Sequence, residues 1–195
     1  MSTEKQRRIY SGRLLSVGLL GGSPEWTATL RQHPGAAGAI AAALAVCACV
    51  PHAGFPALGV AALLCGTVYA DCEPLELLLL PETGAARLLV RKTCTAWRNY
   101  FLLATPFALL TVAAYPRSAW MAAAWIPFAA LLLCYFVVEK YTRYKPDGMP
   151  RRPLAAKLGA AGFLVPLLSP LTLGLMVSYA FRAERNLNRY LHDYD

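Results

Sequence analysis

A long stretch without charge is the feature that most constrains how this chain can fold. Between Gly35 and Ala70 the sequence contains no Asp, Glu, Lys or Arg, and two further apolar blocks follow at residues 100–138 and 158–181. A helix that crosses the hydrocarbon core of a bilayer needs about 20 mainly apolar residues, so each block is long enough to hold a span. Because the blocks alternate with segments rich in Lys and Arg, the pattern predicts an all-α, multi-pass integral membrane protein.

The composition supports a membrane location. Hydrophobic residues make up 57% of the 195 residues and charged residues 15%, whereas an ordinary soluble domain has about 45–50% and about 25%. The net charge of +8 comes from Lys and Arg residues placed at the ends of the apolar blocks. These cations form no continuous face, so we expect them to meet membrane lipids with anionic headgroups and not nucleic acid.

The first apolar block predicts a hairpin of two short spans. At 1.5 Å per residue, residues 35–70 are too long for a single crossing. The sequence Pro-His-Ala-Gly-Phe-Pro at 51–56 is a turn signal near the centre of the block. The two spans are rich in Ala and Gly, which allow membrane helices to approach closely.

The remaining blocks bring the expected number of hydrophobic helices to about five. A second short hairpin is predicted from spans at 100–115 and 120–138, with Pro106 and Pro127 inside them. Proline is tolerated within membrane helices because neighbouring helices can satisfy the freed carbonyl groups. The last block, 158–181, is interrupted by prolines and is predicted to be a broken span.

The chain is expected to form one transmembrane helical domain with polar ends. Residues 1–34 form a cytoplasmic or interfacial N-terminal segment, and 35–181 form the domain, with cytoplasmic loops at 71–99 and 139–157. The N-terminal segment and the first loop are each expected to contain an amphipathic interfacial helix. The N-terminal segment does not read as a cleavable signal and is expected to be retained. Residues 182–195 form a polar C-terminal tail.

The distribution of cations predicts the orientation. With five crossings in the inner membrane of the cell and a cytoplasmic N-terminus, fifteen of the nineteen Lys and Arg residues lie inside. If the last block enters and returns on the same side, eighteen lie inside. Charge therefore favours the re-entrant form, whereas the length of the block favours a kinked single crossing, and both interpretations stay open. The four cations placed outside by five crossings are Arg117, Arg182, Arg185 and Arg189.

The loop at 139–157 is the most basic part of the chain, which predicts contact with lipid headgroups on the cytoplasmic side. The residues expected to make this contact are Lys140, Arg143, Lys145, Arg151 and Arg152.

The sequence carries none of the patterns typical of a catalytic or cofactor site. It has no glycine-rich phosphate loop ending in Gly-Lys-Ser or Gly-Lys-Thr, so the chain is not expected to hydrolyse ATP itself. Its histidines lie far apart and its cysteines lack paired CxxC spacing, which argues against a bound metal. No charged residue lies deep within a predicted span, as a proton relay would require. We expect a protein that is not an enzyme and has no cofactor.

One segment resembles a known family. Residues 73–81 read Glu-Pro-Leu-Glu-Leu-Leu-Leu-Leu-Pro, and after a short polar turn residues 87–92 read Arg-Leu-Leu-Val-Arg-Lys. This segment resembles the cytoplasmic segment of permease subunits of type-two ABC exporters. The two spans, basic loop, Pro-broken span and polar tail that follow are also similar, so the resemblance covers about residues 71–191.

The resemblance implies that the chain is the membrane-spanning subunit of an ATP-driven exporter. Such a subunit needs a separate ATPase subunit and a second permease, in a homo- or hetero-oligomer. The implied ATPase contacts are Glu73, Glu76, Arg87, Arg91 and Lys92. The same residues also fit an ordinary interfacial helix whose cations reach toward the headgroups. The alternative function is therefore a non-transporting membrane scaffold or an accessory subunit of a membrane complex.

Overall fold

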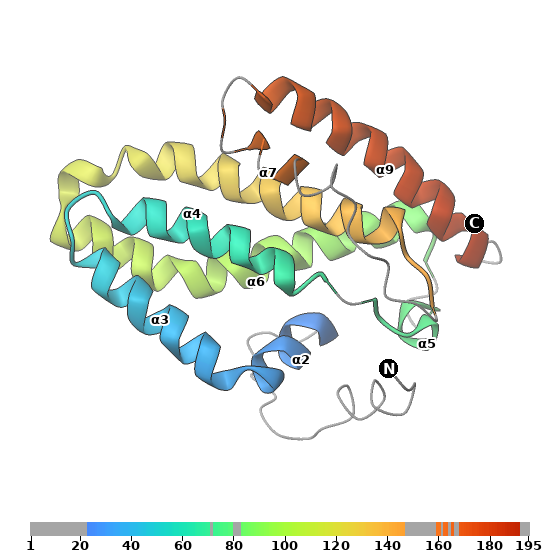
Figure 1. Ribbon diagram of the computed structural model, residues 1–195, viewed down its shortest axis with the longest axis horizontal. Helices are drawn as coiled ribbons and strands as arrows, with labels where there is room; N and C mark the ends of the chain where they lie inside the picture. Colours follow the sequence, from blue (N-terminus) through green and yellow to red (C-terminus); the bar gives the residue numbers. More distant parts are fainter. Residues whose placement is uncertain are drawn as a thin grey trace. The chain divides into compact units, whose positions relative to one another are not determined.

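Helices account for all the regular structure in the part of the chain that the structure describes (Figure 1). This computed structural model describes residues 23–70, 72–79, 83–146, 159–160, 162–163, 165 and 168–191. The expected all-α fold class is confirmed for these residues. The α-helices are α2 (Pro24–Gln32), α3 (Pro34–Ala48), α4 (Gly54–Leu64), α5 (Leu75–Leu79), α6 (Ala85–Ala114), α7 (Met121–Thr142) and α9 (Ser169–Leu191), with short 3-10 helices at Cys65–Thr67 and Pro116–Ser118.

The chain divides into two compact units. Unit 1 comprises Met1–Leu64 and Trp97–Ala129, and unit 2 comprises Cys65–Ala96 and Ala130–Asp195.

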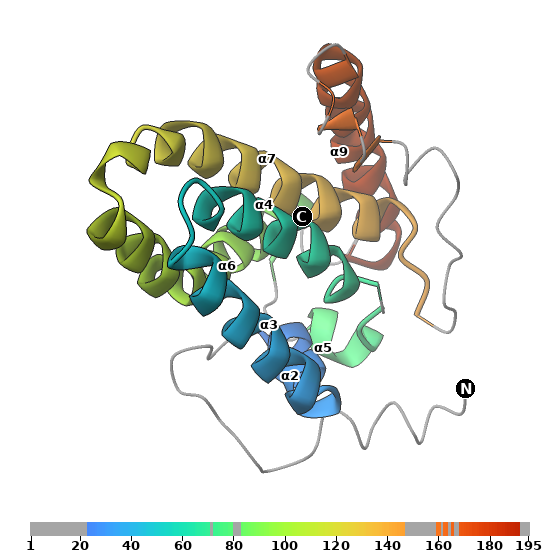
Figure 2. The ribbon, with the colours of Figure 1, turned by 60° about the vertical axis from the view of Figure 1, so that its left-hand side comes forward.

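In unit 1, α3 and α4 form the predicted hairpin (Figure 2). Pro34 begins α3, where its missing N–H costs nothing because the first N–H groups of a helix have no partner within it. Residues 49–53 turn the chain, and His52 adopts a φ of 62°. This left-handed conformation is uncommon for a residue other than glycine and belongs to a tight turn. The turn signal at 51–56 therefore located the hairpin correctly.

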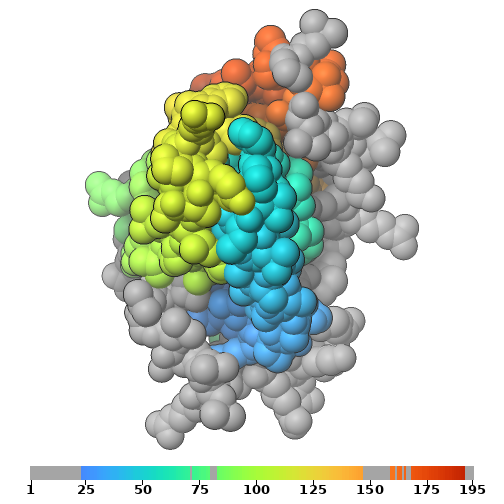
Figure 3. Space-filling view, turned by 90° about the vertical axis from the view of Figure 1, so that its left-hand side faces the viewer, coloured from blue at the N-terminus to red at the C-terminus, as the bar shows by residue number. Residues whose placement is uncertain are grey.

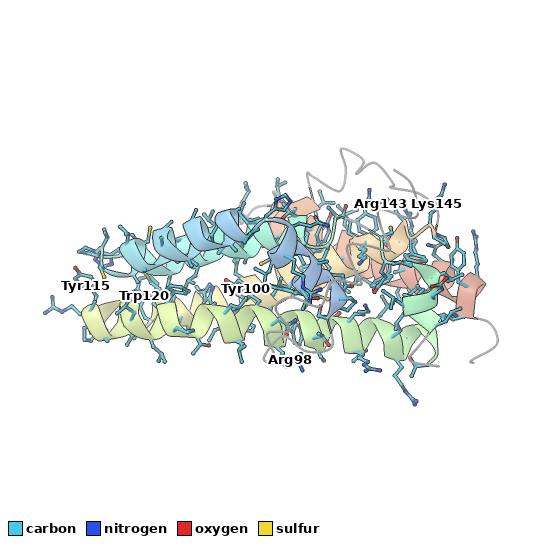
Figure 4. All side chains as sticks on the ribbon, turned by 90° about the horizontal axis from the view of Figure 1, so that it is seen from below. Arg98, Tyr100, Tyr115, Trp120, Arg143 and Lys145 are labelled. Atoms are coloured by element: carbon cyan, nitrogen blue, oxygen red, sulfur yellow. The ribbon has the colours of Figure 1, made fainter. Side chains whose placement is uncertain are left out.

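A second turn lies beside the first at one end of unit 1 (Figure 3). The Tyr115 hydroxyl donates a hydrogen bond to the Cys49 carbonyl at 3.0 Å, which joins the α6 end to the α3–α4 turn. Figure 4 shows Tyr115 and Trp120 at this end, with Tyr100 farther along. There the Tyr100 hydroxyl donates to the Leu58 carbonyl at 2.7 Å and accepts from Trp125 Nε1 at 3.1 Å. These bonds place α4, α6 and α7 around one buried aromatic centre.

Unit 2 is built from α5, the start of α6, the second half of α7, and α9. The inner face of α6 carries the buried Ala85, Leu88 and Ala96 and the half-buried Lys92 at spacings of three and four residues, so these side chains lie on one side of the helix. The buried face of α9 carries Tyr179, Ala183, Leu187 and Leu191, each four residues apart. Lys92 is the charged member of an otherwise apolar stripe.

Several helix boundaries differ from those expected. The interfacial helix expected within 71–99 and the span expected at 100–115 form one continuous helix, α6, of 30 residues. The expected polar tail at 182–195 is helical as far as Leu191, because apolar residues continue to be buried at helical spacing. Helix α2 was not expected. The amphipathic helix predicted near the N-terminus lies outside the described residues.

Among the described residues, one helix is both long and apolar enough to cross a membrane, Met121–Thr142. Helices α3 and α4 are apolar but have 15 and 11 residues. At 1.5 Å per residue they reach about 22 and 16 Å, against a hydrocarbon core of about 30 Å. Of the about five hydrophobic helices expected, one described helix meets both criteria, because α6 and α9 have 30 and 23 residues but are not apolar enough.

Candidate functional site

A buried carboxylate forms a densely connected polar site in the described part of unit 2. The Glu73 side chain is fully buried, with 0% of its surface exposed. Lys92 Nζ donates a hydrogen bond to Glu73 Oε2 at 2.6 Å, and the Tyr141 hydroxyl donates to Oε1. The residue before a proline disfavours helical backbone, so Glu73 stays outside α5, just ahead of Pro74. We call Glu73, Lys92, Lys140, Tyr141 and Tyr144 the Glu73 cluster.

Lys140 brings a second cation to this carboxylate. Its Nζ lies 3.8 Å from Glu73 Oε1, and only 1% of its side-chain surface is exposed. The same Nζ lies 5.5 Å from the ring centroid of Tyr141 and 6.0 Å from that of Tyr69. An aromatic face attracts a cation at such distances, and the attraction is stronger where water is excluded. The carboxylate and the rings together compensate a charge that would otherwise be costly to bury.

The Glu73 backbone is also held. The Tyr144 hydroxyl donates to the Glu73 carbonyl at 2.9 Å. Asn186 of α9 donates from Nδ2 to the carbonyls of Tyr141 and Tyr144, both at 3.1 Å. The Tyr141 carbonyl also accepts from the Tyr144 N–H at 3.3 Å, and Tyr144 follows the end of α7, so this amide ties α9 to the C-terminal end of α7. These hydrogen bonds connect the end of α7 to two other elements, the segment before α5 and helix α9.

The structure separates the five residues expected to contact an ATPase. Glu73 and Lys92 are bonded to each other, and the Glu73 side chain faces the interior of unit 2 and not a surface. Glu76, Arg87 and Arg91 are exposed. Arg87 and Arg91 lie four residues apart on α6, one residue before the buried Leu88 and the half-buried Lys92 respectively. A step of one residue turns a helix by about 100°, which accounts for the difference.

The residues expected at lipid headgroups also differ in their surroundings. Lys140 is buried in the Glu73 cluster, because α7 continues past Val138 to Thr142 and carries Lys140 on its packed side. Arg143 forms an ion pair with Glu139, and 20% of its side-chain surface is exposed. Lys145 is exposed, and Figure 4 shows it near Arg143. Arg151 and Arg152 lie outside the described residues.

Sequence reasoning missed Tyr141, Tyr144 and Asn186. A usable signal exists for the tyrosines: Val137, Lys140, Tyr141 and Tyr144 follow one another at helical spacing and continue the apolar face of α7. No such pattern marks Asn186, whose partners lie more than 40 residues away in the sequence.

The Glu73 cluster connects separate helices through hydrogen bonds and ion pairs. The carboxylate is surrounded by donors, and its bonds run to two different helices. Charge-assisted hydrogen bonds of this kind are roughly twice as strong as neutral ones. In the part of the chain that the structure describes, no group of three His, Cys, Asp or Glu side chains is arranged to hold a metal ion. The cluster can therefore fasten the segment before α5 to α6 and α7.

Comparisons of the chain with protein-family models, with curated proteins and with solved structures gave no match.

Proposed function

We propose that this chain is a multi-pass membrane protein that acts as the membrane-spanning subunit of an ATP-driven exporter. It works with a separate ATPase subunit and a second permease. The observation that carries this proposal is the attachment of the short helix α5 to α6 and α7 through Glu73.

An ATPase can move a membrane subunit only through an element that is firmly connected to its helices. Glu73 lies two residues before α5, and its carboxylate is bound by Lys92 of α6 and Tyr141 of α7. Glu76 is exposed on α5 itself. A force applied to the exposed side of α5 would pass through the Glu73 cluster to two longer helices. This is the mechanical property that a coupling element requires.

The exposed apolar side chains support the membrane part of the proposal. Several large hydrophobic residues of unit 1 are more than half exposed: Val46 at 67%, Val60 at 55%, Leu109 at 65% and Trp120 at 68%. Water would penalise this exposure by roughly 25 cal/mol for each Å² of apolar surface. Lipid tails remove the penalty, and Trp is typical of the membrane interface.

Reversing the two exposed arginines of α6 tests the ATPase contact. We expect Arg87→Glu combined with Arg91→Glu to lower the ATPase recovered with the tagged chain in mild detergent by about tenfold, because like charges would then face the partner. The control is Arg117→Glu, which reverses an exposed arginine of unit 1 on the predicted outer side and should leave recovery unchanged.

The outcome also separates the two functions considered for this chain. If no ATPase follows the unaltered chain, or if the partner remains bound to the double variant, the exporter assignment is wrong. A membrane protein recovered with other partners and without an ATPase would instead fit the scaffold function.

A further inference from the structure

The direction of α9 is set by its contacts with the second half of α7. The rings of Tyr135 and Tyr179 lie 6.0 Å apart, and those of Tyr144 and Tyr190 lie 5.7 Å apart. Both members of the second pair come later in the sequence than those of the first. The two segments therefore run in the same direction, as the orange end of α7 and the red α9 show in Figure 1.

The hydrogen bonds agree with this direction. Thr142 donates from Oγ1 to the Tyr179 carbonyl at 3.0 Å, and Asn186 donates to the Tyr144 carbonyl. At 1.5 Å per residue, the helical segment from Tyr179 to Tyr190 rises by about 16 Å, so Leu191 lies at the level where α7 has ended. The C-terminal end of α9 and the C-terminal end of α7 thus lie at the same end of unit 2.

Two described positions between these helices lie beside Tyr135 in unit 2. Phe163 packs against Tyr135 with ring centroids 5.8 Å apart, and a Cβ added at Gly159 would lie 2.8 Å from the Tyr135 ring carbon Cζ. By Gly159 the chain has therefore returned from the level of Tyr144 to that of Tyr135. Helix α9 then leads back to the level of Tyr144. The described residues that precede and follow this segment, Tyr144 and Tyr190, thus lie at the same end of unit 2.

The exposed face of α9 changes character along its length. Leu171, Gly174, Phe181, Arg185 and Arg189 follow at spacings of three, seven, four and four residues, so they share one face. Leu171 is 63% exposed and Phe181 59%, and a Cβ added at Gly174 would meet no atom within 4 Å. The three arginines of α9, Arg182, Arg185 and Arg189, are all exposed.

We propose that the last apolar block is re-entrant from the cytoplasmic side, and that Arg182, Arg185 and Arg189 bind anionic phospholipid headgroups of the inner leaflet. The proposal rests on the membrane location in the proposed function. An exposed apolar half followed by a cationic half suits a helix that places its first turns in hydrocarbon and its last turns among headgroups. The re-entrant path also leaves Arg117 as the one cation outside, which satisfies the positive-inside tendency.

Cysteine labelling tests the path of the chain. The six native cysteines are replaced, and Arg189→Cys and Arg117→Cys are made separately in the full-length chain. With a membrane-impermeant maleimide, we expect Arg117→Cys to react in intact cells and Arg189→Cys to react only in inside-out vesicles. Labelling of Arg189→Cys in intact cells would overturn the re-entrant path and leave the exporter function standing. If Arg117→Cys is shielded in intact cells, the membrane location itself fails.

A fluorescent protein fused after Asp195 also reports on which side of the membrane α9 ends, and it requires no cysteine replacement. Fluorescence supports the re-entrant path, because such fusions mature in the cytoplasm. A fusion that is inserted in the membrane but does not fluoresce contradicts this path.

Lipid binding is tested with the purified chain in detergent and short-chain phosphatidylglycerol or phosphatidylcholine. Changing all three arginines to Gln is expected to weaken phosphatidylglycerol binding by on the order of 100-fold, from the attraction of each cation to an anionic surface. Phosphatidylcholine binding should not change, and the matched variant with three Lys residues should retain tight binding. Unchanged binding by the Gln variant, or equal competition by inorganic phosphate, would overturn the headgroup assignment.

Discussion

At Glu73 a single carboxylate meets side chains from two helices in a place that water does not reach. Lys92 and Tyr141 bond to its oxygens, and Lys140 lies 3.8 Å away. Burying an ion is costly unless it is paired and hydrogen-bonded, so each member of the Glu73 cluster depends on the others. Loss of the carboxylate would remove the anion that both Lys92 and the buried Lys140 contact.

Removing this carboxylate is expected to destabilise the chain strongly. We expect Glu73→Ala to lower the free energy of unfolding by about 3–5 kcal/mol, the usual cost of breaking a buried ion pair from one side. The measurement is thermal unfolding in detergent. Glu76→Ala, which removes an exposed carboxylate of α5, is the matched control and should change the midpoint little.

A compensated variant distinguishes charge from packing. Glu73→Leu combined with Lys92→Met and Lys140→Met removes all three charges together, and replacing a whole buried ion pair by apolar groups is often neutral. We expect it to recover most of the lost stability. A triple variant as unstable as Glu73→Ala would show that the charges were not the cause.

At the scale of elements, α4 and the second half of α6 approach closely because a glycine faces a threonine. A Cβ added at Gly54 would lie 2.9 Å from Thr111 Cβ and nearer still to its methyl and hydroxyl. Real Cβ atoms are not found this close to another side chain, so a larger residue must push the helices apart. Gly54 begins α4 immediately after the turn that reverses the chain.

Filling this contact is expected to loosen the pair of helices. Gly54→Ala should cost about 1–3 kcal/mol of stability through overpacking, measured by thermal unfolding. Gly38→Ala is the control, because its new Cβ would meet nothing within 4 Å and alanine favours the helix by up to about 1 kcal/mol. Thr111→Ala should rescue Gly54→Ala only in part, since the Thr111 Cβ remains. Equal effects of the two glycine substitutions would refute this account of the packing.

At the scale of the whole molecule, the exposed apolar side chains are the feature that bears on the proposed membrane location. Large apolar side chains are exposed on several helices, including Leu109 of α6, Val177 of α9 and Ile126 of α7. Helix α7 has the length and apolar character of a span, while α3 and α4 are shorter. Short apolar helices are accommodated by local thinning of the bilayer or by association with other helices.

Alkaline carbonate extraction tests membrane integration of the whole chain. We expect the chain to stay in the membrane pellet, because apolar helices inside the bilayer are not released by breaking ionic contacts. The proposed ATPase partner, held at the surface, should be released into the supernatant and serves as the internal control. Release of the chain with its partner would contradict integration and with it the exporter function.

How much could be predicted from the sequence depends on how local each feature is. The helical class and the turn between α3 and α4 follow from nearby residues, because the apolar runs and the Pro-His-Ala-Gly-Phe-Pro segment act within a few positions. Helix ends were less predictable. Helix α9 continues to Leu191 because Ala183 and Leu187 are buried against other parts of unit 2. The many polar residues around them made this segment look like a polar tail in the sequence.

By itself, the sequence determined that this protein is helical, where its first hairpin turns, and which segments carry its cations. Only the tertiary structure decided which of two adjacent cations turns inward, Arg91 remaining exposed while Lys92 binds a carboxylate 19 residues earlier. It also decided the direction of α9, through bonds from Asn186 to the end of α7. The physical reason is that composition and periodicity act over a few residues, whereas a buried charge or a polar side chain is paired with whichever distant group the fold brings to it.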